Sequence, residues 1–293
     1  MRKWILLLPF VLIACAEKGT QNTPPVINAP QEVVKAPLLR PQATTPVQVV
    51  FDKKYEGSKP VNYRKNDKLH MSGSASFSPR ALKDIAKPAK RNKIPLYVFD
   101  LRQESHGYIN DEPVTWQAEH DWANVDLNHD EVIQRERRLL GDLRVGEQID
   151  GTTIKSIETE ESVVRSAGHQ YVRLTVTDHL RPTDSEVDRF IEAVRELPDK
   201  NWVHFHCRAG KGRTTMFMVM YDMLANAQTD SFDDIINRNT KLSDDYDVMA
   251  EVPESDFRHI YQKDRADFVR AFYDYAKAHP HGKDKVWSQW NRK

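Results

Sequence analysis

The chain has 293 residues, of which 39% are hydrophobic and 29% are charged, so it is long enough to bury a substantial core as one large domain or as a domain with an insertion. Lys and Arg together number 43, as do Asp and Glu, and the formal net charge is zero. This balance provides no general attraction to nucleic acid, and we expect no nucleic-acid partner.

The N-terminal segment resembles a bacterial export signal. A basic pair, Arg2-Lys3, precedes an apolar stretch over residues 4–14 that is too short to span a bilayer as a stable helix. The stretch leads into the run Leu-Ile-Ala-Cys at residues 12–15, which is similar to a lipobox.

In signals of that type the cysteine is acylated and becomes the mature N-terminus, which implies a lipid anchor on Cys15. We therefore expect residues 1–15 to be a lipoprotein-type signal peptide and the protein to lie in the bacterial cell envelope, in the periplasm or on the cell surface. An ordinary cleaved signal peptide and an uncleaved anchor are the alternatives.

Residues 16–48 contain six prolines and show neither a helical nor a strand period. This composition is typical of a semi-extended, disordered tether. We expect the folded domain to span residues 49–293.

Helices and strands alternate along the rest of the chain. Capping residues and apolar spacing predict helices that begin after Ser78-Pro79 and after Thr183, where Glu186 completes a capping box. Further helices are predicted over roughly residues 130–140, 215–224, 231–239 and 256–278, and strands over 95–101, 153–157, 171–176 and 202–206. This order is typical of an α/β domain that binds ligands at the carboxyl ends of its strands. Residues 103–122 break the alternation, and we assign them to a small β insertion over roughly residues 103–165.

The most informative run is the nine residues from His206 to Thr214, His-Cys-Arg-Ala-Gly-Lys-Gly-Arg-Thr, which joins the last predicted strand to a buried helix. Glycines in such a loop let successive N–H groups converge on one point, and the helix N-terminus adds its dipole. A thiol in that position is acidic, so Cys207 is the predicted nucleophile. The residues expected to bind a substrate phosphate are His206, Arg208, Ala209, Gly210, Lys211 and Gly212.

Two residues at the end of this run complete the predicted chemistry. Arg213 would fork two N–H bonds onto the phosphoryl oxygens and onto the charge of the transition state. Thr214 would place a hydroxyl near the sulfur and help the thiolate to leave. The alternative is an inert buried Cys207 beside a surface Arg213. If Cys15 carries lipid, however, Cys207 has no intramolecular partner, and a lone thiol in an exported protein is more easily explained by reactivity.

A proton donor for the leaving oxygen is predicted at Asp178. It lies in the run 177–182, Thr-Asp-His-Leu-Arg-Pro, between a predicted strand and the helix capped by Thr183. We assign Asp178 as general acid in the first step and as general base for water in the second. A plain turn aspartate is the alternative. His179 is placed in the site beside it, and a surface histidine is the alternative reading of that residue.

Several stretches resemble the protein-tyrosine-phosphatase-like phytases, which are cysteine-dependent inositol polyphosphate phosphatases of bacteria. They are residues 62–64, 70–74, 100–107, 121–124, 177–179 and 206–215. The Asp-Leu-Arg-Gln-Glu-Ser-His-Gly run at 100–107 and the Asp-Trp-Ala-Asn run at 121–124 are more specific than the cysteine loop. The resemblance covers nearly all of residues 61–290. It implies a tyrosine-phosphatase-like core with a central mixed sheet flanked by helices, a small partial β-barrel, no metal and no cofactor, and stepwise release of phosphate from phytate.

The resemblance also implies further substrate contacts. They fall on Arg64, on Asp121 and, by a looser alignment, on Arg258. Two departures from the family pattern bear on the order of phosphate removal: Arg181 stands where members often have Trp, and a loop that carries a substrate-binding lysine is shortened between residues 143 and 152, where Arg144 could substitute.

The cations inside the loop point to a highly charged substrate. Arg208 and Lys211 at the rim would attract phosphates that flank the one being cleaved, unless they are merely solvated surface charges. The predicted function is hydrolysis of inositol hexakisphosphate and lower inositol polyphosphates through a cysteinyl-phosphate. The alternatives are a protein phosphotyrosine or dual-specificity phosphatase and a non-catalytic inositol-phosphate-binding surface protein.

Overall fold

The computed structural model describes residues 40–52 and 59–291. The predicted signal peptide with Cys15 and residues 16–39 of the predicted tether lie outside the described residues. Within the described ranges, no helix combines the length and the apolar character that a membrane span requires.

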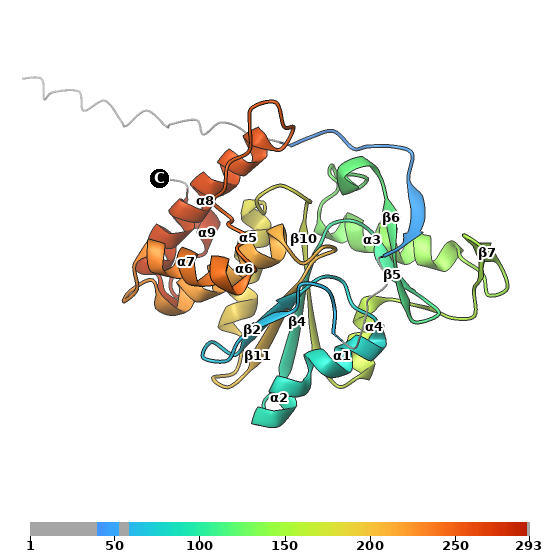
Figure 1. Ribbon diagram of the computed structural model, residues 1–293, viewed down its shortest axis with the longest axis horizontal. Helices are drawn as coiled ribbons and strands as arrows, with labels where there is room; N and C mark the ends of the chain where they lie inside the picture. Colours follow the sequence, from blue (N-terminus) through green and yellow to red (C-terminus); the bar gives the residue numbers. More distant parts are fainter. Residues whose placement is uncertain (1–39, 53–58, 292–293) are drawn as a thin grey trace, which may run out of the picture. The chain divides into compact units, whose positions relative to one another are not determined.

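A five-stranded mixed sheet runs through the folded domain in the order β10-β4-β11-β3-β2 (Figure 1). Four strands are parallel: β10 (Gln170–Val176), β4 (Leu96–Arg102), β11 (Trp202–His206) and β3 (Met71–Ser74). The edge strand β2 (Arg64–Asn66) pairs antiparallel with β3. Three predicted strands are thereby confirmed, and the central mixed sheet expected from the sequence is present. The carboxyl ends of its parallel strands meet at one edge.

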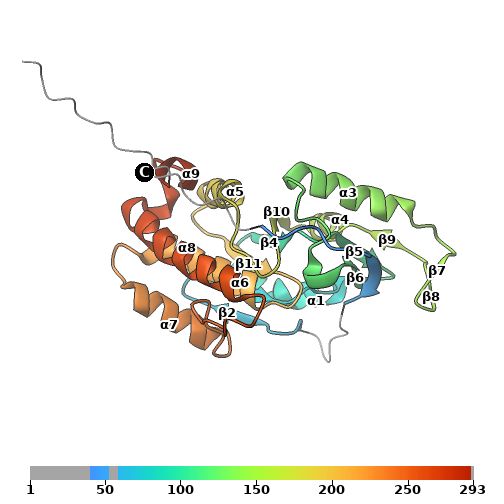
Figure 2. The ribbon, with the colours of Figure 1, turned by 90° about the horizontal axis from the view of Figure 1, so that it is seen from above.

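Helices cover both faces of this sheet (Figures 1 and 2). One face carries α5 (Asp184–Arg195), α6 (Gly212–Asn226), α7 (Phe232–Leu242), α8 (His259–Ala278) and α9 (Trp287–Trp290). The other carries α1 (Pro79–Ile85), α2 (Lys87–Asn92) and α4 (Glu160–Ser166). The helix α6 is buried on nearly every side because it lies between the sheet and α8, and Phe205 of β11 packs with Phe190 of α5 and Phe217 of α6.

The helix starts follow the predicted capping chemistry with one difference. Ser78 accepts a hydrogen bond from the backbone of Ala81, and Thr183 accepts one from the backbone of Glu186. The Glu186 carboxylate, however, accepts the backbone N–H of Thr175 at 2.9 Å instead of reaching back to the cap, so the box is only half formed. Glu186 ties α5 to β10 instead.

A second, antiparallel sheet has the order β1-β6-β5-β9. Its strands are β1 (Gln48–Phe51), β6 (Glu112–Gln117), β5 (His106–Ile109) and β9 (Ile157–Glu158), and α3 (His129–Asp142) packs on it through Leu139 and Leu140. The prediction of one strand over 153–157 was wrong: this stretch holds the end of a hairpin, β7 (Gln148–Ile149) with β8 (Thr152–Thr153), and the start of β9. The β structure expected near 103–165 is present, with β1 added from before it, while its closure into a partial barrel stays a prediction.

Residues 40–47 contact the folded domain. The Thr44 hydroxyl donates to the carbonyl of Glu119 at 2.6 Å, and the Arg40 guanidinium donates to the carbonyl of Val125 at 3.4 Å. The expectation of a free tether up to residue 48 was therefore wrong for this part, because its polar groups are satisfied by the backbone of residues 119–125 and β1 begins at residue 48.

Candidate active site

The phosphate-binding loop lies between the end of β11 at His206 and the start of α6 at Gly212. Cys207 is buried, with 2% of its surface exposed. Its Sγ accepts hydrogen bonds from the backbone N–H of Gly210 and from the Thr214 hydroxyl, both at 3.2 Å. The Thr214 hydroxyl thus lies against the sulfur, where the sequence placed it.

The shape of the loop depends on Gly210. Its φ of +71° lies in the left-handed region, and a Cβ at this position would lie 2.2 Å from the backbone nitrogen of Ala75. Only glycine satisfies both conditions, and the resulting turn directs the Gly210 N–H at the sulfur.

The substitution Gly210→Ala is expected to lower the free energy of unfolding by roughly 2–4 kcal/mol, because it adds left-handed strain and a steric clash. Urea unfolding measures the change. Gly141 in α3 is the matched control, since no atom lies within 4 Å of a Cβ placed there, and Gly141→Ala should stabilise the helix by about 0.5–1 kcal/mol. Equal stabilities for the two variants would contradict this account of the loop.

Arg213 is fixed beside the sulfur by a buried carboxylate. Glu104 accepts two hydrogen bonds from the Arg213 guanidinium, at 2.6 and 2.9 Å, and the carbonyl of Val176 accepts a third at 3.1 Å. Such a bidentate pair fixes both the position and the plane of the guanidinium. The sequence motif at 100–107 contained Glu104, but its role as the partner of Arg213 was not predicted.

A second buried arginine supports Glu104 from behind. The Arg102 guanidinium donates to Glu104 at 3.0 Å and to the Thr115 hydroxyl at 2.6 Å, and it lies 3.4 Å from Asp52. Burial alone would raise the pKa of Glu104, but the charges of Arg213 and Arg102 outweigh it and hold that pKa below the ordinary range. Glu104 is therefore an anion near neutral pH, held beside Arg213.

Asp178 faces the loop as predicted. Its Oδ1 lies 3.2 Å from Nε of Arg213, and 28% of its side chain is exposed. The Trp122 indole N–H donates to the Asp178 carbonyl at 3.1 Å, so the Asp-Trp-Ala-Asn run holds the loop that carries the acid. The carboxyl group thus lies beside the guanidinium that is expected to bind the phosphoryl group, which is where a general acid would be needed.

His179 lies in an aromatic cluster beside the acid. Its Nε2 is 3.4 Å from Asp178 Oδ2, and its ring contacts Phe257, which stacks on His120 with ring centroids 3.9 Å apart. Burial is the main cause that lowers the pKa of His179. The structure thus places His179 against Asp178, as the sequence suggested.

Arg208 and Asp121, both predicted as substrate contacts, pair with each other. The Arg208 guanidinium donates to Asp121 at 2.8 Å, to Asp52 at 3.0 Å and to Gln117 at 2.9 Å. Burial is the main cause that raises the pKa of Asp121, and Arg208 opposes it. Arg208 is therefore not merely a solvated surface charge, which was the alternative to its predicted role, because Asp52, Asp121 and Gln117 hold its guanidinium.

Other predicted residues surround the loop. Lys211 and Ala209 are exposed at the rim, and the Ala209 carbonyl accepts a hydrogen bond from Asn62 at 2.8 Å. The Arg64 guanidinium donates to the carbonyl of Gly210 and to the Thr215 hydroxyl, and burial lowers its pKa to about 10 against the opposing effect of Cys207. In this arrangement Arg64 supports the loop backbone.

Three predictions receive little support from the geometry. His206 is fully buried and pairs with Glu160, so its ring does not line the site; only its backbone leads into the loop. Arg258 is bound to Asp256 at 2.9 Å and lies over the ring of Phe257. Arg144 donates to the carbonyls of Gly141 and Leu143, at the end of α3.

The distances suit one class of reaction. Transfer of a phosphoryl group to sulfur needs an ionised thiol, a fixed cation for the charge that develops on phosphorus, and an acid for the leaving oxygen. Cys207, Arg213 and Asp178 provide the sulfur, the cation and the carboxyl group for such a reaction within one loop and its neighbour. The chain is a cysteine-dependent phosphatase.

Comparison with known proteins defines the family. A solved structure described as a PTP-like phytase from Bdellovibrio bacteriovorus is 67% identical, covers 87% of this chain and 98% of its own, and has a TM-score of 0.85. The family model for PTP-like phytases, described by the words inositol hexakisphosphate, matches residues 127–225. The chain belongs to the PTP-like phytase family, as the resemblance implied.

More distant relatives share the fold. A PTP-like myo-inositol phosphatase from Mitsuokella multacida, solved in complex with myo-inositol-(1,3,4,5)-tetrakisphosphate, is 32% identical, covers 87% of this chain and 50% of its own, and has a TM-score of 0.78. Among curated proteins, effector protein hopD2 of Pseudomonas syringae pv. tomato is 34% identical over 217 residues, which cover 68% of this chain and 46% of that protein. The chain therefore spans about half the length of that curated relative.

Proposed function

We propose that this protein removes phosphates stepwise from inositol hexakisphosphate and lower inositol polyphosphates through a cysteinyl-phosphate intermediate. The observation that carries the proposal is the assembly of Cys207, Arg213 and Asp178 around one loop, in a chain that is 67% identical to a PTP-like phytase. The ligand named for the Mitsuokella complex, an inositol tetrakisphosphate, supports the substrate class.

The reaction follows from the positions of these groups. In the first step the Cys207 thiolate bonds to phosphorus as the bond to the inositol oxygen breaks, and Asp178 gives its proton to that oxygen. In the second step the Asp178 carboxylate takes a proton from water, whose oxygen bonds to phosphorus while the sulfur–phosphorus bond breaks. The Thr214 hydroxyl, 3.2 Å from the sulfur, donates to the departing thiolate.

The rim provides room and charge for a second phosphate. A pocket of about 680 Å³ adjoins the loop, and Asn62, Gln117, Arg208 and Lys211 are among the residues that line it. Since two carboxylates neutralise Arg208, we assign the attraction of a flanking phosphate to Lys211.

Comparison of substrates tests the proposal directly. Phosphate release from phytate should exceed release from a phosphotyrosine peptide at equal concentration, and chromatography of the products should show lower inositol phosphates that appear in sequence. Faster hydrolysis of the peptide would favour a protein phosphatase, and background release from both would favour a binding protein.

The general acid has its own expected signature. Asp178→Asn should lower kcat on phytate by roughly 10²–10⁴-fold, because the inositol oxygen then leaves without a proton. With para-nitrophenyl phosphate as substrate the decrease in kcat should be much smaller, since nitrophenolate is a good leaving group that needs no proton. The exposed Asp142 provides a control, and Asp142→Asn should behave like the wild type. Equal losses on both substrates in the Asp178 variant would argue against the acid role.

We further propose that Cys15 carries lipid and holds the protein in the bacterial cell envelope. The lipobox-like run at 12–15 supports this. Metabolic labelling with a fatty-acid analogue should mark the wild type and Cys207→Ser but not Cys15→Ala, and label on Cys15→Ala would refute the proposal.

A further inference from the structure

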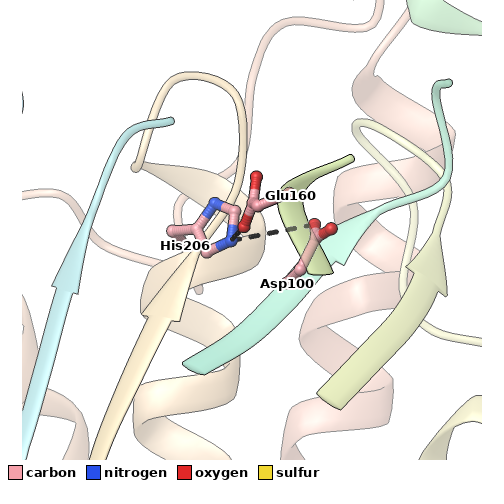
Figure 3. A group of neighbouring side chains, drawn as sticks. All are labelled: Asp100, Glu160 and His206. Carbon is pink, nitrogen blue, oxygen red and sulfur yellow. Dashed lines mark ion pairs between the residues drawn. The ribbon is translucent and has the colours of Figure 1, made fainter. Parts of the chain in front are cut away.

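Phe257 is an exposed aromatic residue at the edge of the active site. It lies just before α8, and 44% of its surface is exposed. The neighbouring group of Asp100, Glu160 and His206, in contrast, lies in the interior, and each of these side chains is 3% exposed or less (Figure 3). Because a largely exposed ring contributes less to the core than a buried one, burial alone does not explain why Phe257 contacts three other rings around the site.

Two of these rings belong to the segment 119–122. The ring of Phe257 stacks on His120, with centroids 3.9 Å apart and planes at 27°, and it meets the indole of Trp122 at 5.8 Å and 78°. Aromatic rings in stacked or edge-on arrangements attract each other beyond the effect of the area that they bury. The Trp122 indole N–H donates to the carbonyl of Asp178 at 3.1 Å. Phe257 therefore supports a residue that holds the backbone of the general acid.

The third ring belongs to the acid loop, residues 177–182. Phe257 meets the ring of His179 edge-on, with centroids 5.4 Å apart and planes at 90°. The Nε2 of His179 in turn lies 3.4 Å from Oδ2 of Asp178. Phe257 thus touches one residue that holds the backbone of Asp178, Trp122, and one that contacts its carboxylate, His179.

The backbone of two of these contact residues has an uncommon conformation. His120 and His179 have φ values of +57° and +68°, in the left-handed region that residues with a Cβ rarely adopt. Such conformations persist where the surroundings fix them, and they cluster at functional sites. Since both histidines contact Phe257 through their rings, the phenylalanine is placed to hold both segments in these conformations.

The other end of the acid loop has anchors of its own. Leu180 is buried in a small apolar cluster, and the guanidinium of Arg181 lies 3.2 Å from the carboxylate of Asp264 in α8. These contacts are not made by Phe257. Removal of its ring should therefore loosen the start of the loop, where Asp178 lies, and leave the rest attached to the domain.

We propose that Phe257 is a positioning residue for the general acid. Its ring holds His179 and Trp122, and through them it keeps the carboxyl group of Asp178 beside the phosphate to be cleaved. Proton transfer needs the donor within hydrogen-bond distance of the leaving oxygen, so a small displacement of the loop slows the first step. The inference rests on the proposed function, in which Asp178 protonates the inositol oxygen.

The kinetic test combines two substitutions. Phe257→Ala should lower kcat on phytate by roughly tenfold, which is part of the 10²–10⁴-fold contribution of a general acid. In the Asp178→Asn background the same substitution should lower kcat no further, because no acid is left to position. On para-nitrophenyl phosphate kcat should change by less than about twofold, since that leaving group needs no proton. Phe257→Tyr keeps the ring and should retain the wild-type kcat on phytate.

Phe232 provides the matched control. Its ring is half-buried, meets Tyr273 edge-on at 5.6 Å and lies under the guanidinium of Arg270, but it belongs to α7. Phe232→Ala removes the same side chain at a place that does not touch the acid loop through these contacts. This variant should keep the wild-type kcat on phytate.

Several results would overturn the proposal. An unchanged kcat in folded Phe257→Ala would do so, as would equal losses on phytate and para-nitrophenyl phosphate or an equal loss in Phe232→Ala. A loss on phytate that persists in the Asp178→Asn background would show that the ring acts on the substrate and not through the acid. All variants are compared with an active wild type. A wild type that releases no phosphate from phytate would contradict the proposed function itself.

His120→Asn provides a second route if Phe257→Ala does not fold. Asparagine tolerates the left-handed backbone but has no ring to stack on Phe257. This variant should also lower kcat on phytate and not on para-nitrophenyl phosphate, to a smaller extent than loss of the phenylalanine. Wild-type kcat on both substrates in His120→Asn would then overturn the proposal.

Discussion

Replacing Cys207 by serine is expected to abolish phosphate release from phytate, with a loss of at least about 10⁴-fold. The serine hydroxyl is not ionised near neutral pH, so it is a far weaker nucleophile at the same place. The loop N–H groups and Arg213 remain, and phytate should still bind. Isothermal titration calorimetry measures the binding, and phosphate release measures the turnover.

Cys15→Ala is the matched control for this experiment, because it removes the other cysteine of the chain and should keep full turnover. Wild-type release by Cys207→Ser would exclude the cysteinyl-phosphate route. Loss of binding along with turnover would indicate instead that the loop had collapsed.

Glu104→Gln is expected to have the second large effect. The substitution leaves Arg213 and Arg102 without their shared carboxylate in a fully buried place, and the loss of one partner from such a pair typically costs 3–5 kcal/mol. Arg213 then loses its fixed plane, and kcat/KM should fall by about 10²-fold or more. Denaturant unfolding and phytate kinetics measure the two effects, with the exposed Glu254→Gln as control.

The effect on stability should depend on pH in a defined direction. The pKa of Glu104 is lower in the folded protein than its ordinary value. The contribution of its charge to the free energy of unfolding is therefore fully present above about pH 4.5, and it is lost as the pH falls toward the pKa that Glu104 has in the folded protein. The difference in the free energy of unfolding between the wild type and Glu104→Gln should therefore become smaller below pH 4. A constant difference from pH 7 to pH 3 would show that the ion pair is not its source.

Much of the site could be predicted from the sequence because its chemistry is local. One run of nine residues contains the nucleophile, the turn glycines, the arginine and the helix start, and the helix dipole and loop geometry need no distant partner. Asp178 could be placed because it follows β10, a parallel strand whose carboxyl end lies at the same edge of the sheet as that of β11, with β4 between them. The helices that follow Ser78 and Thr183 were recognisable from their own capping residues.

What could not be predicted depends on contacts between distant segments. β3 is fully buried, yet its sequence Met-Ser-Gly-Ser has no apolar pattern; its hydroxyls are satisfied by His204 and by backbone groups. β1 joins β6 across more than sixty residues, so no local signal indicates the pairing. The acids that neutralise Arg208 are likewise distant in sequence.

The position of Asp52 has a practical consequence for protein production. This residue follows β1 and connects Arg102 to Arg208, so the amino-terminal strand completes the wall of the catalytic loop. A shortened gene product that starts after residue 52 would lack that wall, even though it would retain Cys207, Asp178 and Arg213. Soluble versions for crystallisation should therefore retain Asp52 together with Arg40 and Thr44, which donate to carbonyls within residues 119–125.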